Sequence, residues 1–171
     1  MTNDQKKVAA GAASGIFNML TGLIALSGII AGLAADAGAG ERFAYAVKWI
    51  AAAALPLALA VASVGNARFN SEAIDPTAGK ESAAMVVNGR VVDNTVQQYL
   101  LFAAASLAVA AGARGDQLGT VAAGSIMFIV LRLAFWIGYR IKPVYRAAGF
   151  AGTFYLNIAL FAYALWLAWL A

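Results

Sequence analysis

Five apolar stretches, each about as long as a bilayer is thick, constrain the fold more than any other feature of this chain. A helix needs about 20 residues to cross the hydrocarbon core of a membrane. In the chain as a whole, 63% of residues are hydrophobic and only 12% are charged, unlike typical soluble domains. We therefore predict an all-α, integral membrane protein with five transmembrane helices. The predicted spans cover approximately residues 12–35, 43–66, 94–113, 118–139 and 149–169.

The first stretch follows Lys6 and Lys7 and could be mistaken for a secretory signal peptide. Its apolar core is longer than the ~7–15 residues of such a signal, so we predict a retained helix. Pro56 lies in the middle of the second stretch and predicts a kink there. Residues 67–93 form the one long polar segment, which we expect to be a surface loop with a short helix around residues 82–87.

Polar residues repeat at helical intervals where the third stretch begins. Arg90, Asn94 and Gln97 or Gln98 are spaced by three or four residues, which places them on one helix face. A polar stripe facing lipid would be costly, so it must face protein, water or a ligand. The alternative is a polar helix entrance at the level of the lipid headgroups.

The fourth stretch carries an arginine inside its apolar run. An uncompensated guanidinium such as that of Arg132 costs at least ~2.5 kcal/mol near the bilayer centre. Arg132, Phe135 and Tyr139 are spaced by three and four and share a helix face, and a basic link ending at Arg146 follows. This pattern fits either a ligand site or a positive-inside anchor with an interfacial aromatic belt.

The distribution of Lys and Arg residues predicts the orientation. If the N-terminus is cytoplasmic, eight of these residues lie inside, namely Lys6, Lys7, Arg68, Lys80, Arg90, Arg140, Lys142 and Arg146. Three lie outside, namely Arg42, Lys48 and Arg114. Both polar stripes and the long loop then meet at the cytoplasmic face of the cell inner membrane, and this convergence favours a site over an anchor.

The residue types at this face indicate a small anionic guest. Guanidinium groups pair with carboxylate or phosphate, and amide and tyrosine side chains add directional hydrogen bonds. A guest with a thiol would be favoured as its thiolate beside an arginine or a tyrosine hydroxyl. The chain has no cysteine and no histidine, and none of its eight carboxylates lies within a long apolar run, so we expect no metal site.

The order of these residues resembles the MAPEG family, the membrane-associated proteins of eicosanoid and glutathione metabolism. The resemblance rests on Arg90, Asn94 and Gln97 opening one span, and on Arg132, Phe135, Gly138 and Tyr139 closing the next, with Arg146 seven residues later. It covers residues 42–171 and leaves residues 1–41 as an N-terminal region with an added helix. The family implies a four-helix bundle, a homotrimer, and glutathione bound between subunits near the cytoplasmic face.

The resemblance also implies individual roles. Arg90, Asn94 and Tyr139 match glutathione contacts, and Arg146 matches the arginine proposed to stabilise the glutathione thiolate. Arg68 is similarly placed to an arginine at the end of the first core helix, although the loop that follows differs in length. The remaining candidate contacts are Gln97, Gln98, Arg132 and Phe135.

Two departures from the family pattern weaken the expected affinity for glutathione. Gln97 replaces a common glutamate, and Phe135 replaces a common tyrosine. Losing a charge-assisted contact costs ~1.5–3 kcal/mol, or roughly ten- to a hundredfold in affinity.

Two functions therefore remain open. The first is a glutathione transferase or peroxidase acting on lipophilic electrophiles or hydroperoxides from the bilayer. The second is a non-catalytic scaffold, or an accessory subunit of a larger membrane complex, in which the added helix docks a membrane protein partner. A transporter is less favoured, because no span contains a carboxylate for ion coupling. Nucleic-acid binding is not supported, because membrane orientation accounts for the net charge of +4.

Overall fold

The structure is a computed structural model that describes residues 1–169, and it is all-helical in that range. Five helices or helix pairs are long and apolar enough to cross a membrane, which confirms the predicted class and number of spans. The long helices are α1 (Asn3–Ile29), α2 (Ala39–Ala53), α3 (Leu55–Phe69), α4 (Ala83–Gly112), α5 (Gly119–Ile141) and α6 (Ala147–Trp169). Short 3₁₀ helices are η1 (Glu72–Ile74), η2 (Gly115–Leu118) and η3 (Pro143–Arg146).

The second span is bent into α2 and α3, as the proline predicted. Ala54 separates the two helices, and Pro56 lies in the first turn of α3. A proline in this position lacks an N–H that the first turn would leave unpaired in any case, so the bend places it where its cost is smallest.

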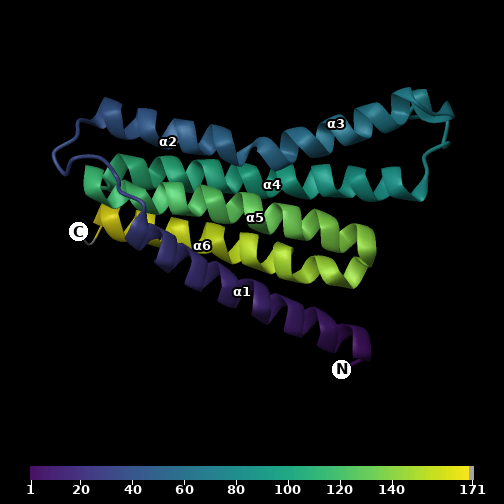
Figure 1. Ribbon diagram of the computed structural model, residues 1–171, viewed down its shortest axis with the longest axis horizontal. Helices are drawn as coiled ribbons and strands as arrows, with labels where there is room; N and C mark the ends of the chain where they lie inside the picture. Colours follow the sequence, from purple (N-terminus) through teal and green to yellow (C-terminus); the bar gives the residue numbers. More distant parts are fainter. Residues whose placement is uncertain (170–171) are drawn as a thin grey trace.

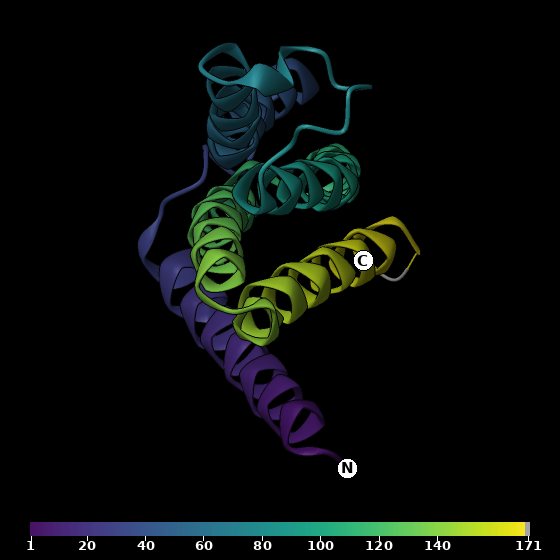
Figure 2. The ribbon, with the colours of Figure 1, turned by 90° about the vertical axis from the view of Figure 1, so that its right-hand side faces the viewer.

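The helices lie side by side along the long axis of the molecule in a layered order. Pair α2–α3 covers α4, α5 follows, and α6 and α1 form the opposite side (Figure 1). Viewed along the bundle, α1 leans across α5 and α6 (Figure 2). The added helix is therefore packed onto the bundle rather than separate from it.

Glycines permit the close approach of α1. A Cβ atom at Gly15 would collide with the carbonyl oxygen of Ala148 on α6. A Cβ atom at Gly11 would lie 3.3 Å from the Cβ of Ala147. Small residues of this kind are the usual contact surface between membrane helices, because they let two backbones pack closely.

Two helices begin before the predicted spans. The short helix expected around residues 82–87 forms the first turns of α4, so the connection between α3 and α4 is shorter than the expected loop at residues 67–93. Helix α4 begins at Ala83, where Ser82 accepts a hydrogen bond from the Met85 N–H and caps the helix. At 30 residues it is about 45 Å long, which exceeds the ~30 Å hydrocarbon core. Its polar first turns extend the helix beyond the core instead of ending it. Helix α1 likewise begins at Asn3, after the capping residue Thr2.

The connections divide the molecule into two ends. The N-terminus, the α3–α4 connection and the α5–α6 turn lie together at one end (Figure 1). We call this the basic end, because it carries Lys6, Lys7, Arg68, Arg140, Lys142 and Arg146. The α1–α2 and α4–α5 connections lie at the other end, which carries Arg42 and Arg114 and which we call the turn end.

Candidate functional site

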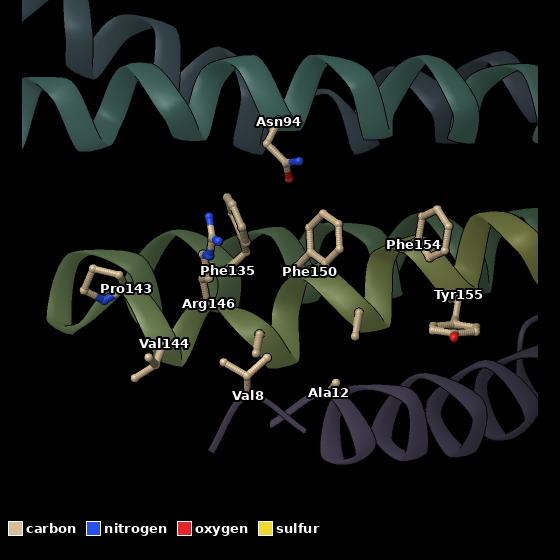
Figure 3. Close-up of a pocket in the computed structure, with 12 residues that line it drawn as sticks. Val8, Ala12, Asn94, Phe135, Pro143, Val144, Arg146, Phe150, Phe154 and Tyr155 are labelled. Atoms are coloured by element: carbon tan, nitrogen blue, oxygen red, sulfur yellow. The ribbon is translucent and has the colours of Figure 1, made fainter. Parts of the chain in front are cut away.

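A cavity of about 630 Å³ lies near the basic end, and four long helices contribute to it. Helix α6 lies between α4 and α1 in the close-up (Figure 3). Arg146 and Phe150 point toward Asn94 on α4, whereas Val144 points toward Val8 on α1 (Figure 3). The lining of the cavity is mainly apolar, with Asn94 and Arg146 as the strongly polar groups. Such a cavity suits an amphipathic guest.

Arg132 lies beside this cavity and is only 1% exposed. Its Nη1 donates to Oδ1 of Asn94 at 2.9 Å, and its guanidinium carbon lies 4.0 Å from the centre of the Phe135 ring. Its Nε and Nη2 atoms are buried without a hydrogen-bond partner among residues 1–169. Three predicted site residues thus meet here, around a cation that lacks a counter-ion within the described chain.

Tyr139 and Arg146 form a second contact at the same end. The Arg146 guanidinium carbon lies 4.9 Å from the centre of the Tyr139 ring, which is the geometry of a cation–π contact. A Cβ atom at Gly138 would lie 2.6 Å from the Tyr145 carbonyl oxygen. Glycine at this position therefore lets η3 fold back against α5 and return Arg146 to the aromatic ring.

Gln98 is directed away from this group. It is 5% exposed, and its Oε1 accepts a hydrogen bond of 2.9 Å from Asn157 on α6. Gln97, in contrast, is exposed on α4, whereas Gln98 serves the contact between α4 and α6. Gln98 does not line the cavity.

Arg90 and Arg68 also lie outside the cavity lining. Arg90 is exposed on the same face of α4 as Gln97. Arg68 forms an ion pair with Glu81 across the α3–α4 connection, at 2.6 Å. Of the nine predicted site residues, the cavity lining itself includes Asn94, Phe135 and Arg146.

A partly buried hydrogen-bond chain beside the site is not predicted from the sequence. The Trp136 Nε1 donates to Oδ1 of Asn88 at 2.9 Å, and Asn88 Nδ2 donates to Oγ of Ser63 at 2.9 Å. These contacts join α3, α4 and α5. The available signal is Asn88, six residues before Asn94, but it lies in the segment predicted to be a loop. Within residues 1–169, no three His, Cys, Asp or Glu side chains gather as metal ligands.

These features define a multi-pass membrane protein with an amphipathic cavity and several arginines at one end of a helical bundle. The MAPEG family matches residues 43–166, and the chain belongs to that family. Helix α1 precedes the matched segment, so the cavity combines family helices with a helix from outside the family match. No curated protein and no solved structure matches the chain.

Proposed function

We propose that the protein is a glutathione-dependent membrane transferase or peroxidase that acts on lipophilic electrophiles or hydroperoxides. The observation that carries this proposal is Arg132, a buried cation with two unpartnered nitrogens beside the cavity. A buried charge without a partner is strongly unfavourable, so a bound carboxylate is the natural counter-ion. Glutathione carries two carboxylates, and membership of the MAPEG family supports it as the guest.

The proposed chemistry is shared by two residues, Arg146 of η3 and Tyr139 near the end of α5. Arg146 stabilises the glutathione thiolate, because a nearby cation lowers the pKa of a thiol. The Tyr139 hydroxyl donates a hydrogen bond to the same sulfur. In the transferase reaction the thiolate forms a C–S bond while the leaving group departs with its electron pair. The protein then needs no cysteine of its own.

We propose that the active form is a homotrimer with the ligand between subunits. Arg90 and Gln97 support this arrangement, because both are exposed on a face of α4 that also carries exposed Leu100 and Leu101. A face with both polar and apolar groups suits a partner helix and a ligand better than lipid alone. The positive-inside rule supports a cytoplasmic N-terminus and basic end in the cell inner membrane.

The alternative function is a scaffold or accessory subunit. Phe135 favours it, because this side chain is 1% exposed and places an apolar ring where a hydroxyl would serve catalysis. Helix α1 also presents exposed Phe17 and Ile24, which could contact a membrane protein partner. Co-purification of the chain as a stoichiometric part of a larger complex, without a bound thiol, would favour this function.

The test is thiol-dependent turnover of a generic aryl chloride by the detergent-purified protein. Arg146→Ala should lower kcat/KM roughly a hundredfold, because it removes the cation that stabilises developing charge on sulfur. Arg140→Ala is the matched control, since Arg140 is exposed near the same turn and does not line the cavity. Equal activity in the two variants would reject the proposed role of Arg146.

A further inference from the structure

We propose that α1 forms one wall of the cavity and determines which apolar tails the substrate can carry. This inference rests on the proposed function and concerns the lipophilic substrate rather than glutathione. Val8 and Ala12 of α1 line the same cavity as Asn94 and Arg146. Because the family match begins at residue 43, this wall lies outside the segment that matches the family.

The wall is held in place at two distant points. Near the basic end, Gly15 packs against the start of α6 with no space for a side chain, and Gly11 lies in tight contact with Ala147. Near the turn end, the Leu33 N–H donates to the Gly115 carbonyl oxygen at 2.8 Å. These contacts hold α1 against the bundle from Gly11 onward, and Val8 and Ala12 lie next to the first of them, so this wall can discriminate between ligands by shape.

The polar and apolar residues of the lining lie on different sides of α6, and this separation orients the ligand. The polar groups Asn94 and Arg146 lie on the α4 side of α6, and Val144 and Tyr155 point toward α1 (Figure 3). A substrate whose reactive atom meets the thiolate near Arg146 must therefore pass α6 to reach Val8. One helix with side chains is roughly 10 Å wide, so short substituents stop before α1 and long alkyl tails contact it.

The walls facing the tail are mainly apolar, with the Tyr155 hydroxyl as a polar group among them, and this sets the chemical class of the occupant. Val8, Ala12, Val144 and Ala151 carry no donor or acceptor on their side chains, and an unpaired polar tail would be penalised there. We therefore assign the α1 side of the cavity to an extended alkyl or acyl chain. The exposed apolar surface of Val8, at 41%, is the part of α1 such a chain would cover.

The test compares the binding of S-methylglutathione and S-decylglutathione by calorimetry in detergent. Ala12→Leu fills part of the α1 side of the cavity and should weaken S-decylglutathione binding by roughly tenfold, with S-methylglutathione unchanged. Val8→Phe is a second variant at a more exposed position, with the same expectation. Ala13→Leu is the matched control, because Ala13 is exposed and does not line the cavity.

Three outcomes are distinguishable. Selective loss of S-decylglutathione binding in both cavity variants, with the control like wild type, supports the inference. Unchanged preference for the long chain in all variants overturns the inference and leaves the glutathione site intact. Failure of wild type to bind even S-methylglutathione overturns the proposed function, and the inference falls with it.

Discussion

The bundle holds two partly or fully enclosed arginines, Arg42 at the turn end and Arg132 in the half of α5 nearer the basic end, and their surroundings are opposite. At the turn end, all three guanidinium nitrogens of Arg42 donate to backbone carbonyl oxygens, those of Ala110, Ala37 and Ala111, at 3.2, 3.0 and 3.4 Å. Near the basic end, Arg132 makes one hydrogen bond, to Asn94, and keeps two nitrogens unpartnered within the described residues.

The difference separates an arginine whose partners the protein supplies itself from one to which the proposed function assigns a ligand. Ala110 and Ala111 belong to the last turn of α4, whose free carbonyl groups carry the negative end of the helix dipole. Arg42 therefore ties α2 to α4 with groups the protein supplies itself. The surroundings of Arg132 supply a single amide oxygen and an aromatic ring, which do not balance a buried charge.

Removing Arg42 should have the largest effect, and the effect should be on stability. Arg42→Met deletes three hydrogen bonds worth about 1 kcal/mol each, so we expect the free energy of unfolding to fall by about 3 kcal/mol. The melting temperature in detergent should fall by roughly 5–10 °C. Lys48→Met, which removes an exposed charge from the same helix, is the control and should melt like wild type.

Removing Arg132 should weaken ligand binding and leave stability unchanged. Arg132→Met replaces an unbalanced buried charge with an apolar chain of similar length, so we expect no loss of melting temperature. Calorimetry should show glutathione affinity weaker by roughly ten- to a hundredfold, because the carboxylate loses its cation. Arg140→Met removes an exposed arginine from the same helix and should leave both quantities unchanged.

These two substitutions can also break the comparison. A large fall in the melting temperature of Arg132→Met, with glutathione affinity retained, would show that Arg132 is as structural as Arg42. The unpartnered nitrogens would then be satisfied by water or by another subunit rather than by a ligand.

Gln97→Glu should give the smallest effect, and it should strengthen binding. It restores a carboxylate on the exposed face of α4, where it can meet the ammonium group of glutathione. We expect roughly tenfold tighter binding, or about 1.4 kcal/mol. Gln97→Met keeps the side-chain length without the charge, so a gain in that variant would mean that the carboxylate is not the cause.

The spans, the kink and the arginine-rich end follow directly from the sequence. The spans follow from the length of the apolar stretches, and the kink follows from the missing N–H of Pro56. The arginines are conspicuous because a charge such as that of Arg132 is costly in an apolar run. The family resemblance, carried by a few spaced residues, is confirmed by the match over residues 43–166.

The remaining features depend on tertiary contacts that spacing does not encode. Gln97 and Gln98 differ by one position, which is about 100° around a helix. Which of the two side chains is buried therefore depends on where Asn157 lies. The predicted third span begins later than α4, because a run of polar residues indicates the edge of the membrane core and does not show that the helix continues beyond it. The wall formed by Val8 and Ala12 depends on how α1 packs against α6, which only the fold reveals.

The most direct test of the central claim is a calorimetric titration of the purified wild-type protein with glutathione, alongside Arg146→Ala. We predict binding in the micromolar to low-millimolar range, between about −8 and −4 kcal/mol, which weakens in the variant. No detectable heat with wild-type protein, or the same affinity in both proteins, would contradict the account and turn attention to a scaffold within a larger membrane complex.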